Sequence, residues 1–165
     1  MSPRVRKLGL TVHVIASAGW LGAALVFVAL SIGGLTLDNE QAVRAVYLAM
    51  EPAGRYALLP LAVASFVSGM VQSLGTDWGL FRHYWVVFKL GINVFATLIL
   101  VMYLGTFRAI AENASESVVA LETVRNPSPL IHSVLGVIAL TVATVLAVYK
   151  PRGALHVSNP LMPRR

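Results

Sequence analysis

The chain contains no cysteine and has few charged residues. Without cysteine it can form no disulfide, no thiolate metal site and no cysteine nucleophile. Only 12% of its 165 residues are charged, whereas an ordinary soluble domain carries about 25%. The hydrophobic share is 57% and the mean hydropathy is +0.75. This composition predicts a membrane protein, and it leaves no room for a separate soluble enzyme domain.

Three long stretches contain no Asp, Glu, Lys or Arg: residues 8–37, 56–76 and 126–149. Each is longer than the roughly 18 to 20 apolar residues that cross about 30 Å of hydrocarbon. A fourth stretch qualifies if Lys89 is accepted inside it. The sequence therefore predicts one transmembrane domain over residues 1–165. The predicted spans are about 8–35, 55–76, 83–106 and 129–149.

The charges are distributed unevenly between the two predicted sides of the membrane. All acidic residues except Asp77 lie in the first and third connections, whereas basic residues gather before the first span, in the second connection and after the last span. By the positive-inside rule, this places both termini in the cytoplasm of a plasma-membrane protein. The basic excess then serves orientation and attraction to anionic lipid, and no nucleic-acid partner is predicted. These basic residues are Arg4, Arg6, Lys7, Arg82, Lys150, Arg152, Arg164 and Arg165.

The two outer connections each predict a short helix at the membrane interface. In the first, Asp38 and Gln41 have the spacing of a capping box, and the apolar residues that follow lie on one helical face. In the second, the sequence predicts a short helix at about 117–124. We expect an all-α fold, namely an integral membrane up-down four-helix bundle with short interfacial helices in the outer loops. The apolar face of the first short helix comprises Val43, Val46, Tyr47 and Met50.

Polar residues lie at a similar depth in all four predicted spans. His13, Gln72, Lys89 and Thr144 each lie about four or five residues from the cytoplasmic end, which is roughly 6 to 8 Å at the rise of an α-helix. Helical spacing extends this layer along the first and third spans. Intramembrane polar residues of this kind usually face the protein interior, so we predict a polar cavity open to the cytoplasmic leaflet. The predicted ligand-binding residues are His13, Ser17, Trp20, Gln72, Lys89 and Asn93.

Two simpler interpretations stand beside this site. Lys89 has a long stem and can extend its amine to the headgroups. His13 can be a packed histidine that bonds a neighbouring serine or carbonyl. No Asp or Glu lies inside any predicted span to pair with Lys89. Lys89 is then either a neutral amine that can act as a base or ligate a metal, or a cation that pairs with an anionic ligand such as a propionate or a lipid phosphate. His83 is expected in an interfacial belt, and His132 lies about a bilayer thickness from His13, too far to ligate the same haem.

Two segments carry a resemblance to known families. The segments HVIASAGWLGAALVFVAL (residues 13–30) and LFRHYWVVFKLGINVFATLIL (residues 80–100) resemble a family of short four-span bacterial membrane proteins of unknown function. A histidine followed by Trp-x-Gly on the first span, with a lysine on the third, resembles two further groups more distantly. These are the HemJ family of protoporphyrinogen oxidases and the copper resistance D membrane domain.

The HemJ resemblance implies a b-type haem with His13 as the axial metal ligand and Lys89 as the second functional group. The chain lacks the arginine-rich segment that this family has soon after the histidine, because residues 27–34 read FVALSIGG. Enzymatic activity is therefore left open.

Three functions follow as hypotheses. The first is a cavity that binds a cofactor or a small amphiphile, most concretely haem b. The second is a non-catalytic accessory subunit of a larger membrane complex. The third is a copper or metabolite transporter, which would require a homo-oligomer to enclose a path. In each case the lipid bilayer is the first partner.

Overall fold

The computed structural model describes residues 2–75 and 83–149, and within these ranges the chain forms helices and no strand. The all-α prediction is confirmed for this part of the chain. The elements in chain order are α1 (Pro3–Thr36), α2 (Glu40–Ala53), the π-helical turn η1 (Gly54–Leu58), α3 (Leu59–Leu74), α4 (Tyr84–Ser115), α5 (Leu121–Val124) and α6 (Ser128–Tyr149).

Four helical segments are long and apolar enough to cross a membrane, by length and composition. They overlap the four predicted spans, and each of them extends beyond the predicted span at one end or both. α1 begins at Pro3 because the Ser2 hydroxyl caps the helix and proline suits its first turn. α4 continues past residue 106 through an exposed ion pair between Arg108 and Glu112. The segments are Pro3–Thr36, Glu40–Leu74, Tyr84–Ser115 and Leu121–Tyr149.

Some sequence predictions fall on residues outside the described part of the chain. They are the end of the second span at residue 76, the basic residue Arg82, and the basic residues from Lys150 onward.

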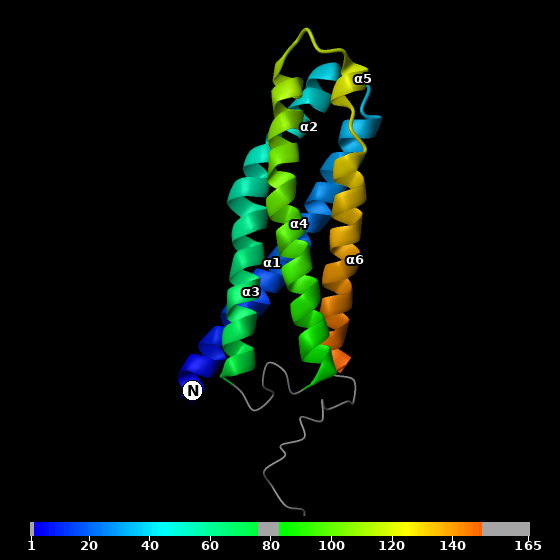
Figure 1. The fold of residues 1–165 in the computed structure, drawn as a ribbon. Coiled ribbons are helices and arrows are strands. Elements are labelled where there is room, and N and C mark those ends of the chain that lie inside the picture. The colour runs from blue at the N-terminus through cyan, green and yellow to red at the C-terminus, as the bar shows by residue number, and fades with distance from the viewer. Residues whose placement is uncertain (1, 76–82, 150–165) are drawn as a thin grey trace, which may run out of the picture.

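The long helices lie side by side, and α1 crosses the others obliquely (Figure 1). α1 packs against both α3 and α6, α2 packs against α4 and α1, and α4 packs against α6 and α3. We call the end of the molecule that holds the start of α1 the amino-terminal end. We call the other end, where α2 and α5 lie, the cap end (Figure 1).

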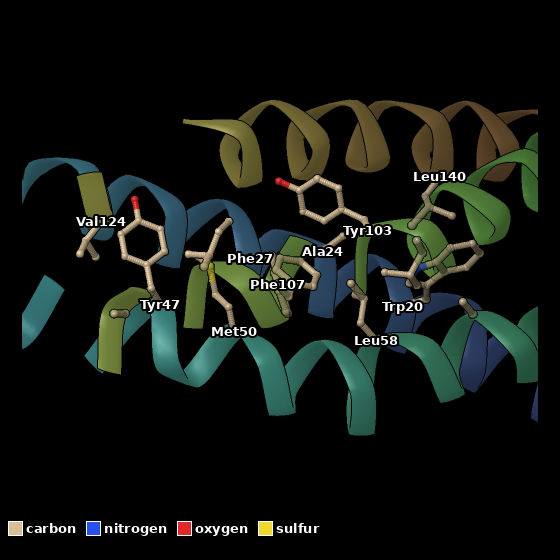
Figure 2. Packing of buried hydrophobic residues seen from close by; sticks show 14 of the residues in the cluster. Trp20, Ala24, Phe27, Tyr47, Met50, Leu58, Tyr103, Phe107, Val124 and Leu140 are labelled. Atoms are coloured by element: carbon tan, nitrogen blue, oxygen red, sulfur yellow. The ribbon is translucent and has the colours of Figure 1, made fainter. Parts of the chain in front are cut away.

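The apolar face predicted for the first connection is buried in α2. Val43, Tyr47 and Met50 are at most 1% exposed, and Figure 2 shows Tyr47 and Met50 extending from the same side of α2. The helix starts one residue later than the predicted capping box, because Asn39 Oδ1 accepts the Ala42 amide at 2.9 Å. α5 is shorter than predicted and covers only Leu121–Val124.

Two arginines close the cap end by hydrogen bonding to main-chain carbonyls. Arg44 on α2 donates to the carbonyls of Glu116 at 2.9 Å and Val119 at 2.6 Å, just after the end of α4. Arg125, after α5, donates to the carbonyls of Leu35 at 2.6 Å and Leu37 at 2.7 Å, where α1 ends. Because the last carbonyls of a helix have no partner within it, these guanidinium groups fix the ends of the two longest helices.

The π-helical turn η1 precedes a proline. Pro60 has no amide hydrogen, so it cannot continue the regular bonding pattern, and the Leu59 amide bonds the Gly54 carbonyl five residues back. Gly54 also allows a close approach, since a Cβ there would lie 3.0 Å from Phe107 Cδ2. The turn carries the buried Leu58 into the core between α1 and α4.

Aromatic side chains dominate the core between α1 and α4. The ring centroids of Phe27 and Phe107 lie 5.1 Å apart, and those of Tyr103 and Phe107 lie 4.9 Å apart in an edge-on arrangement. Figure 2 shows Trp20 and Leu140 in the same region, from α1 and α6. This packing separates a polar region near the amino-terminal end from a mainly apolar one toward the cap end.

Candidate functional site

The imidazole of His13 is anchored to α3 through one ring nitrogen. Nδ1 lies 3.1 Å from the Ser65 carbonyl oxygen and 3.1 Å from Ser68 Oγ. A carbonyl oxygen can only accept, so Nδ1 carries the proton and Nε2 presents its lone pair. The same pattern, with Nδ1–H on a backbone carbonyl, orients histidines that bind a group through Nε2.

The ring of His13 lies directly against a glycine on α3. A Cβ at Gly69 would lie 3.0 Å from His13 Cε1, so any larger residue there would push the ring away. One turn further along α1, Ser17 Oγ lies 2.8 Å from Ser65 Oγ, and this pair ties α1 to α3 beside the histidine. His13 therefore has a fixed orientation in the groove between two helices.

A small cavity joins this histidine to α4. Lys89 and Asn93 line it together with His13, and its volume of about 20 Å³ suits one water-sized group. The Lys89 amine lies 5.8 Å from the centroid of the Trp85 ring, within the range of a cation–π contact. The structure thus brings together three of the predicted site residues. On α3 the cavity is lined by Ser65, Phe66, Gly69, Met70 and Ser73.

Asn93 contributes a buried acceptor to this region. Its Nδ2 donates to the Lys89 carbonyl at 3.2 Å, whereas its Oδ1 has no hydrogen-bond partner among the residues that the structure describes. The same holds for Thr97 Oγ1, one turn further along α4. A buried acceptor without a hydrogen-bond donor costs free energy. A ligand atom that donates a hydrogen bond would therefore be favoured beside Asn93.

Three other predicted members of the polar layer lie elsewhere. Gln72 Nε2 donates to the Arg6 carbonyl at 3.1 Å, and Gln72 is not among the described residues that line the cavity. Trp20 is 3% exposed and belongs to the aromatic core. Thr144 is exposed and bonds the Leu140 carbonyl of its own helix at 2.8 Å. The described polar site is therefore formed by α1, α3 and α4, without α6.

A second and larger cavity lies toward the cap end. Its volume is about 310 Å³, and it is bounded by α1, α4 and α6. Its described lining contains no Asp, Glu, Lys or Arg, and its only polar side chains besides Trp20 and Tyr103 are His132 and Ser133. Sequence reasoning missed this site. The available signal was the spacing of Trp20 with Phe27 and of Tyr103 with Phe107, which places aromatic residues on one face of each helix.

Within residues 2–75 and 83–149, no three His, Cys, Asp or Glu side chains come close enough to hold a metal ion. A metal at His13 would therefore need other donors. Comparison with protein-family models, with curated proteins and with solved structures finds no match to this chain.

Proposed function

We propose that this chain is a multi-pass plasma-membrane protein that holds a small ligand at His13. In this proposal the four apolar helices form an up-down bundle in the bilayer, and both termini are cytoplasmic. Support comes from the four segments long enough to cross a membrane and from the charge distribution. α2 and α5 then lie at the outer interface, and the His13 cavity lies in the inner half.

The observation that carries the ligand site is the fixed ring of His13. Its Nδ1 is held by Ser65 and Ser68, so Nε2 is the nitrogen available to a ligand. Lys89 and Asn93 line the same cavity from α4 and supply an amine and an amide. Polar residues placed together inside a membrane segment are costly, and this supports a role beyond packing.

Haem b is the cofactor named by the family resemblance, and the residues fit it only in part. His13 Nε2 suits an axial bond, and the Lys89 amine suits a propionate. The cavity of about 20 Å³ does not fit a porphyrin, which is many times larger than a water molecule. Haem binding is therefore tested directly by the absorption spectrum of the purified protein.

A single metal ion is the second candidate, and the size of the cavity favours it. Met70 lines the cavity with His13, and a thioether with an imidazole is a donor pair that suits copper(I). The amine of Lys89 is a further donor once it has lost its proton, which metal binding can release. Under this proposal the chain would carry or sense copper at the membrane.

Spectroscopy and metal analysis of the purified protein test both candidates. We expect either a Soret band or stoichiometric copper in the wild type, and its loss in His13→Ala. His132→Ala is the matched control, because that histidine lies in another part of the molecule and should leave the signal unchanged. A wild type without either signal after supplementation with haem and with copper would refute the site. Recovery of a stoichiometric protein partner in mild detergent would then favour an accessory subunit.

A further inference from the structure

We propose that the larger cavity between α1, α4 and α6 is a second binding site, and that it takes an uncharged apolar molecule with a hydroxyl group. This site is separate from the one at His13 and does not depend on it. Part of its lining belongs to the aromatic core, namely Trp20, Phe27, Tyr103 and Phe107.

The size and lining of the cavity indicate the chemical class of its ligand. Its volume of about 310 Å³ lies within the usual range for small-molecule sites, about 300 to 1,000 Å³. Trp20, Phe95 and Phe107 supply aromatic walls, and no Asp, Glu, Lys or Arg is found in the described lining. Phe95 and Leu135 are 67% and 58% exposed, so they form the open rim of the cavity, whereas Trp20 and Phe107 lie deep in it. A phosphate, carboxylate or ammonium group in the deep part would have no charged partner in the described lining, so this lining favours an uncharged ligand.

The hydrogen bonds of His132 indicate which polar group the ligand carries. His132 Nδ1 lies 2.9 Å from the Ser128 carbonyl oxygen, which only accepts, so Nδ1 is the protonated nitrogen and Nε2 is an acceptor. Nδ1 also lies 3.3 Å from Ser128 Oγ. The ring is held against Tyr103, with 4.2 Å between the centroids, and the Tyr103 hydroxyl donates to Ser128 Oγ at 2.7 Å.

Ser133, the other polar side chain that α6 contributes to the lining, is also a hydrogen-bond acceptor. Ser133 Oγ donates to the Leu130 carbonyl at 3.1 Å, so its hydrogen is used and its lone pairs accept. Both polar groups that α6 contributes therefore accept hydrogen bonds. A ligand that donates, such as an alcohol or a phenol, satisfies them, whereas an ether or a ketone does not.

The position of His132 along α6 fits an amphiphile. His132 lies one turn from the start of the helix at Ser128, and Ala139 lines the cavity seven residues further along. At 1.5 Å per residue, the apolar part of the cavity extends about 10 Å from the histidine toward the middle of the helix. A bound molecule would place its hydroxyl near the cap end and its apolar body among the core side chains.

Two glycines provide a matched test of this cavity. Gly136 lines it, and a Cβ on Gly136 would meet no atom within 4 Å, so Gly136→Leu fills the space without a clash at the backbone. Gly105 on α4 is exposed, and a Cβ there also meets no atom within 4 Å, but Gly105 does not line the cavity. Gly105→Leu therefore makes the same chemical change outside the site.

The probes are farnesol and its methyl ether, which differ in the hydrogen-bond donor. Binding to the delipidated protein in detergent is measured by equilibrium dialysis. We expect farnesol to bind about tenfold more tightly than the ether, the effect of one net hydrogen bond. Gly136→Leu should weaken farnesol binding at least tenfold, Gly105→Leu should leave it unchanged, and His132→Phe should reduce the preference for the alcohol, with Ser133 as the remaining acceptor.

Organic extraction of the freshly purified protein, followed by mass spectrometry, distinguishes the sources of such a ligand. A stoichiometric neutral hydroxylated lipid in the wild type, missing from Gly136→Leu, identifies the bilayer as the source. Farnesol binding without such a lipid identifies a free molecule. Equal affinity for alcohol and ether in the wild type, or equal loss in both leucine variants, would overturn the proposal. If Gly136→Leu does not fold, the wild-type comparison with His132→Phe decides it.

Discussion

Replacing Arg125 by methionine is expected to lower the free energy of unfolding by about 3 kcal/mol. The guanidinium donates to the carbonyls of Leu35 and Leu37 at 2.6 and 2.7 Å, and it lies 3.4 Å from the Gly34 carbonyl oxygen. Hydrogen bonds to a charged group are among the stronger ones, and methionine leaves the carbonyls at the end of α1 without this donor. Chemical unfolding in detergent micelles, followed by circular dichroism, measures the change.

Arg108→Met is the matched control for this prediction. Arg108 pairs with Glu112 one turn away, and its side chain is 70% exposed, so its loss should leave the unfolding midpoint unchanged. Arg125→Lys tests whether the planar shape of the guanidinium is needed in addition to its charge, because an ammonium cannot reproduce the planar donors that reach two carbonyls at once. Equal midpoints for Arg125→Met and Arg108→Met would show that the cap end does not depend on these hydrogen bonds.

The helices could be predicted from local features of the sequence, namely the absence of charge over a long run and the spacing of apolar residues. Charge-free runs located three of the four long helices, and the fourth was found by accepting Lys89 inside an apolar run. Helical spacing placed Val43, Tyr47 and Met50 on the buried face of α2. Helix ends were less predictable, because α4 does not stop where charge begins. Arg108 and Glu112 lie on its exposed surface and can continue the helix as an ion pair.

The role of Arg125 was beyond the reach of sequence reasoning. Its carbonyl partners at the end of α1 are 88 to 91 residues away in the chain. Sequence analysis assigned no role to the arginines of the outer connections. The structure shows that Arg125 and Arg44 act as caps for distant helix ends, which requires knowledge of which ends meet.

The candidate site shows that neither predicted depth nor helical spacing determines which side chains meet, since Gln72 and Thr144 do not line the His13 cavity. His13 and Trp20 lie seven residues apart, so they were expected on one face of α1 and in one site. Because α1 crosses its neighbours obliquely, the same face meets α3 at His13 and the aromatic core at Trp20 (Figure 1). A residue's depth follows from counting, whereas its neighbours depend on the crossing angle of the helices.

The larger cavity was missed for a related reason. Its walls come from ordinary core residues of α1, α4 and α6, and nothing in their types distinguishes a wall from a close contact. Gly136 and Ala139 leave room on α6, but small residues in a membrane helix more often mark tight packing. Only the positions of the three helices show that the space stays open.

The second large effect is expected at two adjacent glycines near the end of α1. A Cβ at Gly34 would lie 2.8 Å from Tyr47 Cζ, closer than real contacts allow, whereas a Cβ at Gly33 would lie 3.6 Å from Leu37 Cδ1, an ordinary contact. Tyr47 cannot easily move, because it is fully buried and its hydroxyl is bonded to both the amide and the carbonyl of Asn126.

Gly34→Ala should therefore lower the free energy of unfolding by about 1 to 3 kcal/mol, the usual cost of overpacking a core. Gly33→Ala should raise it by about 0.5 to 1 kcal/mol, because alanine favours the helix more than glycine does. The same unfolding measurement compares the two variants. Each adds one methyl group, at neighbouring positions, and we expect the changes in the free energy of unfolding to have opposite signs. A stabilised Gly34→Ala would mean that Tyr47 can shift without losing Asn126. Combining Gly34→Ala with Tyr47→Leu separates these cases, since a smaller side chain should relieve the clash and make the two changes non-additive.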